Sequence, residues 1–156
     1  MAGVHRVATA ILKWFSALYV VAIVVQVFLA GEGIFRMSVI KNSDDCDKGA
    51  PHCVSNSTTL DAHRGLGFFL TMPGALLFLI VALLAWYPET RVRVVSILAP
   101  IFTFLQIVLA GAGGWVAGLH PVNAIVVLGM FGWLAYRLFT APAAATVPEP
   151  VTATST

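Results

Sequence analysis

Four long apolar stretches constrain this chain more than any other feature of its sequence. They lie at about 11–35, 65–87, 94–113 and 122–139, and a helix needs about 20 apolar residues to cross the hydrocarbon core of a bilayer. Inside lipid every backbone polar group must be satisfied within the segment, so stretches of this length fold as helices. The sequence therefore predicts an all-α fold, an integral membrane four-helix bundle that forms a single domain over residues 1–140.

The composition favours lipid over water as the main solvent of the chain. Of its 156 residues, 59% are hydrophobic and only 10% are charged, whereas a soluble domain has about 25% charged residues. The formal net charge of +2 and the lack of a basic cluster argue against a nucleic-acid partner. The predicted partner is thus the lipid bilayer. Residues 141–156 are rich in Ala, Pro and Thr and cannot build a core, so we expect a disordered cytoplasmic tail.

The charges and the two cysteines predict how the chain is oriented. Lys and Arg are only slightly commoner on the side of the chain ends than on the opposite side, which holds the predicted external loop 36–62 and Arg64, so the positive-inside rule is weak alone. Cys46 and Cys53 both lie in that loop, and a pair this close is a natural disulfide in an oxidising compartment. The alternative is a metal site that also uses His52. We expect a multi-pass plasma-membrane protein with cytoplasmic termini and an extracytoplasmic Cys loop.

The two halves of the chain carry a matching pattern. The hexapeptides Q-V-F-L-A-G at 26–31 and Q-I-V-L-A-G at 106–111 lie in the first and third stretches, and a histidine opens the next stretch in each half, His63 and His120. Because two helices return the chain to its starting side, superposing the hexapeptides predicts two helix pairs related by a parallel repeat.

His63 and His120 are the strongest candidate ligands. Imidazole is a common axial ligand of haem iron, and four-helix bundles bind cofactors between facing helices. The second and fourth helices are diagonal partners in an antiparallel bundle, so both rings could bind one haem b near the outer face. The alternative is that each ring meets water or headgroups at a helix start, and His120 precedes Pro121, a common helix-entry pattern. Small residues would leave room for the macrocycle: Gly31, Gly65, Gly67, Gly111, Ala124 and Gly129.

Three further polar residues belong to the predicted haem site. Gln26 and Gln106 lie inside spanning stretches, where an amide usually hydrogen-bonds a neighbouring helix. The functional alternative is a hydrogen bond to a histidine that fixes its tautomer, or a contact to a quinone head, and Asn123 has the same two interpretations. Arg64 lies near the outer interface and suits a haem propionate. Its alternative is a headgroup contact or pairing with Asp61 or Glu32.

These motifs together resemble one four-helix half of the haem A synthase family. In that family two four-helix units are joined, each unit binds haem between histidines on its second and fourth helices, and some bacterial members have a close cysteine pair in the first external loop. The chain is also similar to small uncharacterised four-helix bacterial membrane proteins. The resemblance covers about 13–139, and the matching residues are Cys46, Cys53, His63-Arg64 and the motif L-His120-x-x-x-A.

Two departures from the family shape the predicted function. Leu60 stands where the family's first half has an acidic residue, and this chain has one four-helix unit, which together argue against the family's haem-oxygenating activity. We assign no catalytic residue. Two histidine ligands leave the iron no open position, so the resemblance implies a b-type haem protein for electron transfer or haem handling. Its expected partners are a second copy or a larger respiratory-type membrane complex, and a quinone or redox partner. The alternative is a cofactor-free accessory or assembly subunit of a larger membrane complex.

Overall fold

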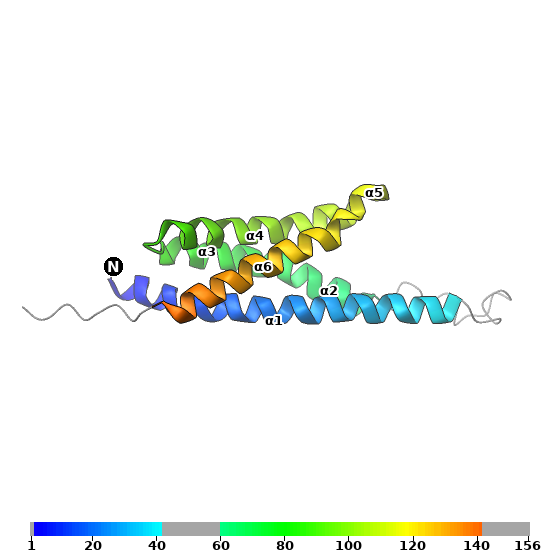
Figure 1. The fold of residues 1–156 in the computed structure, drawn as a ribbon, viewed down its shortest axis with the longest axis horizontal. Helices are drawn as coiled ribbons and strands as arrows, with labels where there is room; N and C mark the ends of the chain where they lie inside the picture. Colours follow the sequence, from blue (N-terminus) through cyan, green and yellow to red (C-terminus); the bar gives the residue numbers. More distant parts are fainter. Residues whose placement is uncertain (1, 42–59, 142–156) are drawn as a thin grey trace, which may run out of the picture.

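The computed structural model describes residues 2–41 and 60–141, with side chains for 3–35 and 60–141. These residues form helices joined by short turns (Figure 1). The first long helix is α1 (Ala2–Lys41), and the second consists of α2 (Asp61–Phe69), the π-helical turn η3 (Leu70–Gly74) and α3 (Ala75–Ala85) in direct succession. The third is α4 (Thr90–Gly111), and the fourth consists of α5 (Gly114–Ala117) and α6 (Leu119–Thr140).

Within the part of the chain that the structure describes, four helical segments are long and apolar enough to cross a membrane, as the sequence predicted. They are Gly3–Phe35, Asp61–Ala85, Thr90–Gly111 and Gly114–Thr140. All four long helices begin before the predicted stretches, and α1 continues through Lys41 into the region predicted as a loop. The second and third end two residues sooner than predicted, at Ala85 and Gly111. Apolar stretches underestimate helix length because backbone hydrogen bonds continue through flanking charged residues. The all-α fold with four long apolar helices is therefore confirmed.

The four long helices pack in a ring. α1 packs against α3 and α6, and α4 packs against the same two helices. The two remaining pairs, α1 with α4 and α3 with α6, make at most weak contact and are the diagonals of the bundle. α6 crosses α1 at an angle in Figure 1, so the two helices meet closely near one end of the bundle and separate toward the other. His63 and His120 thus lie on diagonally opposite helices, as expected for an antiparallel bundle.

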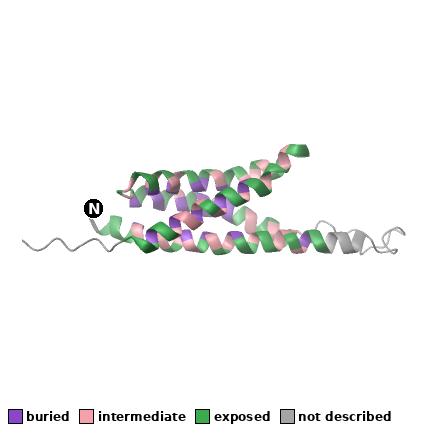
Figure 2. Cartoon of the chain, in the orientation of Figure 1, coloured by how far each residue is buried: buried purple, intermediate pink, exposed green. Residues whose placement is uncertain are grey.

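The buried core lies toward the end of the bundle that holds the start of α1, the α3–α4 turn 86–89 and the end of α6, which we call the Glu89 end (Figure 2). Its centre is an aromatic cluster of Tyr19, Phe78 and Phe131. The Tyr19 ring stacks on Phe131 with centroids 4.3 Å apart, and Phe78 meets Phe131 edge-on at 4.9 Å. Such pairs add about 0.5–1.5 kcal/mol to the stabilisation from burial alone.

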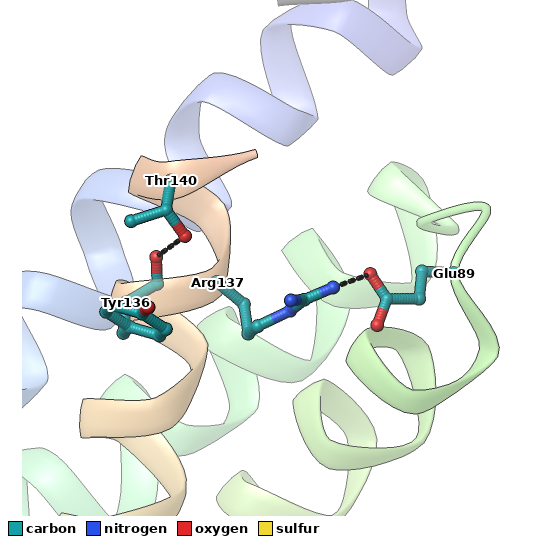
Figure 3. A network of polar contacts seen from close by, with 4 residues as sticks. All are labelled: Glu89, Tyr136, Arg137 and Thr140. Carbon is teal, nitrogen blue, oxygen red and sulfur yellow. Dashed lines mark hydrogen bonds and ion pairs between the residues drawn. The ribbon is translucent and has the colours of Figure 1, made fainter. Parts of the chain in front are cut away.

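Polar contacts close the Glu89 end. Arg137 Nη2 donates to Glu89 Oε2 at 2.7 Å, which ties α6 to the α3–α4 turn (Figure 3). The turn itself begins at Trp86, whose φ of 33° is left-handed and ends α3. The Lys13 ammonium lies 4.2 Å from the centre of the Phe139 ring and ties α1 to the same end of α6. All four long helices are therefore fixed at this end.

A π-helical turn separates this core from the opposite end. Pro73 has no N–H, so the carbonyl of Phe69 loses its usual helical partner, and the ladder shifts so that the Ala75 N–H donates to the Leu70 carbonyl. The Tyr19 hydroxyl donates to the same carbonyl at 3.0 Å. Beyond the turn, α2 contains no buried residue. We call the end that holds α2, α5 and the start of α6 the histidine end.

Candidate functional site

The structure brings the two predicted histidines together at the histidine end. His63 lies on the first turn of α2, and His120 lies on the first turn of α6. Both side chains are half-buried. Their ring centroids are 6.4 Å apart, and the ring planes meet at 78°. The second and fourth long helices are diagonal in the bundle and make no close contact with each other. Their two imidazoles nevertheless lie close enough to contact one small group.

Each histidine ring is held by a main-chain carbonyl of the preceding long helix. His63 Nδ1 lies 3.1 Å from the carbonyl oxygen of Gln26, and His120 Nδ1 lies 3.0 Å from that of Gln106. A carbonyl oxygen only accepts hydrogen bonds, so Nδ1 is the donor in both contacts and carries the proton in the neutral form of each ring. The other nitrogen, Nε2, is then left with a free lone pair. This is the form in which a histidine binds a metal, with its second nitrogen oriented by a carbonyl.

Gln26 returns a second hydrogen bond to its histidine. Its side-chain Nε2 donates to the carbonyl oxygen of His63 at 2.7 Å. Two hydrogen bonds thus join the residues: the Gln26 main-chain carbonyl bonds the His63 ring, and the Gln26 side-chain amide bonds the His63 main-chain carbonyl. The interhelical hydrogen bond expected of a glutamine in a spanning helix is present, and so is a hydrogen bond to the histidine ring. The ring contact, however, uses the main-chain oxygen rather than the side-chain amide.

Gln106 makes the equivalent pair of bonds in one of its two amide orientations. With Nε2 toward His120, it donates to the His120 carbonyl at 2.9 Å and Oε1 accepts from the Ala124 N–H at 3.2 Å. In the opposite orientation Oε1 accepts from Asn123 Nδ2 at 2.9 Å. The first orientation gives up the Asn123 bond and places Gln106 Nε2 2.9 Å from Asn123 Nδ2. We favour it because it removes a contact between two oxygens and gains two bonds, while Asn123 keeps its bond to the Phe102 carbonyl at 2.9 Å. Both glutamines then hold their histidines in the same way.

Gly67 is a residue whose role the sequence did not reveal. A Cβ at this position would lie 2.6 Å from Gln26 Nε2, so any side chain would displace the amide. Of the residues predicted to leave room for a macrocycle, Gly31, Gly65, Gly111 and Gly129 have no atom within 4 Å of an added Cβ. The space beside Gly67 is instead occupied by the side-chain amide of Gln26. The only signal in the sequence was its position one turn after His63.

One polar atom of the site has no partner. Gln26 Oε1 is buried and lacks a hydrogen bond among the residues that the structure describes. Leaving a buried acceptor unpaired costs about 1–3 kcal/mol. An unused buried acceptor therefore lies on the residue that bonds His63.

The spacing of the rings suits a shared metal. Two metal–nitrogen bonds of about 2.0 Å, together with about 1.1 Å from each nitrogen to its ring centre, put the centroids about 6 Å apart. The observed 6.4 Å agrees with that value. The centroid separation does not depend on the angle between the ring planes, so the 78° angle does not affect this agreement. Within residues 2–41 and 60–141, no three His, Cys, Asp or Glu side chains form a metal-binding group.

Arg64 lies on α2 next to His63 in sequence, and its side chain is exposed. Its Nη1 is 3.7 Å from Asp61 Oδ1, and both side chains are about three-fifths exposed (59% and 62%). An ion pair this open to solvent contributes about 0–1 kcal/mol. The pairing with Asp61 expected as one alternative is therefore present, although it holds the guanidinium only weakly.

Some predictions are not tested by this geometry. Cys46, Cys53 and His52 lie outside the described residues, as does the tail from 142 onward, so the disulfide, the extracytoplasmic loop and the disordered tail stay predictions. The resemblance to the haem A synthase family also stays a prediction, because no family model, curated protein or solved structure matches the chain.

Proposed function

We propose that this chain is an integral membrane b-type haem-binding protein that transfers electrons or handles haem. One haem would be held between His63 and His120. The observation that carries the proposal is the pair of imidazoles with centroids 6.4 Å apart, each with Nδ1 bonded to a carbonyl and Nε2 left as a ligand.

The donor set favours haem over a bare metal ion. A bare zinc or similar ion needs about four ligands, whereas the described residues offer two nitrogens and no third His, Cys, Asp or Glu beside them. Haem contributes four equatorial nitrogens and needs only two axial ligands. When bound, it supplies a one-electron couple. With both axial positions filled by protein, electron transfer or haem handling is favoured over chemistry that needs an open position.

Other residues of this end have proposed roles around the haem. Gln26 and Gln106 line the pocket and hold the ligands. Arg64 would bind a propionate, because Arg is well suited to planar carboxylates. Its ion pair with Asp61 is long and exposed, so that one contact competes little with a propionate.

The proposal includes a membrane and an orientation. The four long helices suit a bilayer by length and composition. Five basic residues belong to the Glu89 end, which supports a cytoplasmic position for that end: Arg6, Lys13, Arg91, Arg93 and Arg137. The histidine end and the loop with Cys46 and Cys53, closed by a disulfide, would then face the outside of the plasma membrane.

We also propose that the two helix pairs are a parallel repeat. The support is that the matching hexapeptides begin with Gln26 and Gln106, whose carbonyls bond the two histidine rings at 3.1 and 3.0 Å. If the six-residue match were due to chance, we would not expect the first residue of each hexapeptide to bond a histidine ring through its main-chain carbonyl. In each pair, then, the first helix orients the ligand and the second carries it.

The test is the absorption spectrum of the protein purified in detergent from haem-supplied cells. We expect a six-coordinate low-spin haem in the wild type and its loss in His63→Ala and His120→Ala. His5→Ala is the matched control, because His5 is exposed near the start of α1. A colourless wild-type protein, or an unchanged spectrum in both site variants, would contradict the proposal. A colourless protein that co-purifies with a respiratory complex would favour the accessory-subunit alternative.

A further inference from the structure

We infer that Gln26 and Gln106 are positioning residues that fix both the ligating nitrogen and the plane of each histidine ring, and that Gly67 makes room for the first of these contacts. The consequence for an iron centre rests on the proposed function. The consequence for the histidines themselves does not, because it concerns hydrogen bonds that exist without any metal.

Packing alone does not hold the His63 ring. The ring is half-buried, and α2, the helix that carries it, has no buried residue. A side chain at such a position is free to change rotamer unless polar contacts restrain it. The bond from Nδ1 to the Gln26 carbonyl is that restraint, and it fixes which way the ring turns.

The Gln26 side chain holds the backbone under the ring. By donating to the His63 carbonyl at 2.7 Å, it fixes the first turn of α2 against α1. Neither bond alone would suffice, because the ring bond permits the helix to slide and the amide bond permits the ring to rotate. Together they close a cycle between the two residues. Their joint effect is to keep Nε2 directed away from α1.

Gln106 holds His120 by the same pair of bonds, from α4 to α6. The two planes are therefore set by two separate helix pairs, and they meet at 78°. Each ring that keeps its Nδ1 bond cannot turn freely about a bond from Nε2 to a metal. The contacts thus set the two ring planes nearly perpendicular to each other before any metal binds.

Gly67 permits a test that alters neither the glutamine nor the histidine. A Cβ at Gly67 would lie 2.6 Å from Gln26 Nε2, whereas a Cβ at Gly65 would meet no atom within 4 Å. Both glycines lie in α2, so both substitutions by Ala raise helix propensity by the same amount. Gly67→Ala should break the amide contact, and Gly65→Ala should leave it intact.

The first measurement is the EPR spectrum of the ferric haem protein. Near-perpendicular imidazole planes leave two iron d orbitals close in energy and give a strongly anisotropic signal with one large g value. Near-parallel planes give a rhombic three-line signal. We expect the first signal for the wild type and Gly65→Ala, and a shift toward the second for Gly67→Ala, Gln26→Met and Gln106→Met. We also expect roughly tenfold faster loss of haem to a scavenging apoprotein in these three variants.

The second measurement needs no haem. Nitrogen NMR of the haem-free protein with labelled histidine reports which ring nitrogen carries the proton. We expect Nδ1 protonation for His63 and His120, and a mixture of tautomers for His63 in Gly67→Ala and for His120 in Gln106→Met. His5 is the internal reference for an exposed ring.

The outcomes separate the two proposals. A protein that binds no haem but shows Nδ1-protonated rings overturns the proposed function and leaves the positioning role standing. The positioning role is overturned if the protein binds low-spin haem but its EPR signal and its rate of haem loss are unchanged in all three variants. The proposed haem-binding function would then remain supported. Nε2-protonated rings in the haem-free wild type overturn the positioning role directly.

Discussion

The two ends of this bundle are held by different forces. At the Glu89 end α3 buries Phe78, Val81, Ala82 and Ala85 among the other helices. At the histidine end α2, which continues the same helix, buries nothing. Contacts there are polar and specific, between two glutamines and two histidines. The difference indicates that the Glu89 end carries most of the packing that maintains the fold, while the histidine end depends on a few polar contacts and is the less stable region.

The largest loss of stability should come from a substitution in the core. Comparing it with a substitution at the histidine end tests whether the core provides most of the stability. Phe78→Ala removes a fully buried ring that contacts Tyr19 and Phe131. We expect it to lower the free energy of unfolding by about 3–5 kcal/mol. Phe68→Ala, at a residue 59% exposed on α2, should change it by about 0.5 kcal/mol or less. Unfolding in mixed detergent micelles measures the stability of both variants. Equal losses of unfolding free energy would contradict the difference between the two ends.

The junction between the two ends should have an intermediate effect. Tyr19→Phe removes the hydroxyl that donates to the Leu70 carbonyl in η3 but keeps the aromatic cluster. Because that carbonyl still accepts from the Ala75 N–H, we expect a loss of about 1 kcal/mol in the same unfolding assay. Haem binding should be unchanged. A loss of haem without a loss of stability would show that the junction serves the site instead of the core.

The histidine end should respond unequally to its two glutamines. Gln106→Met removes an amide whose oxygen has a partner in Ala124, and an interhelical hydrogen bond in a membrane protein is worth about 0.6 kcal/mol on average. Gln26→Met also removes a buried oxygen that has no partner, which offsets part of the loss. We therefore expect Gln26→Met to destabilise the haem-free protein less than Gln106→Met. The reverse order in thermal unfolding would contradict the assignment of the unpaired atom.

The smallest effect should come from the ion pair at the surface of the Glu89 end. Glu89→Gln weakens the contact with Arg137, whose side chain is 43% exposed. We expect a small fall in Tm that disappears at high salt, because exposed charges are screened. Arg91→Ala, an exposed charge at the same end, is the control. A large, salt-independent fall would mean that this contact closes the end of the bundle on its own.

The sequence was sufficient to predict the four helices and the pairing of the histidines. Uninterrupted apolar stretches identify spanning helices because lipid permits few alternatives. The repeated hexapeptide then placed Gln26 and Gln106 one helix before His63 and His120, and these four residues do meet. Fold and site were predictable to this extent because both depend on periodic or repeated residue types.

The remaining details depend on geometry that no residue type encodes. The acceptors for the two rings are main-chain carbonyls, which every residue has, so the sequence could not identify them. The role of Gly67 depends on how closely α2 approaches Gln26, and the residue type at position 67 does not reveal that distance. Hydropathy also missed the extent of α1, because a helix continues through charged residues wherever its hydrogen bonds are satisfied.

One consequence of the two histidine contacts concerns the order in which the bundle assembles. His120 reaches Gln106 across 14 positions, whereas His63 reaches Gln26 across 37. Closing the longer loop costs about 0.9 kcal/mol more entropy, so we expect the second helix pair to dock first. Earlier protection of the first pair in pulsed hydrogen exchange would contradict this order. The helix pair that comes second in the sequence would then form the surface against which the first pair packs.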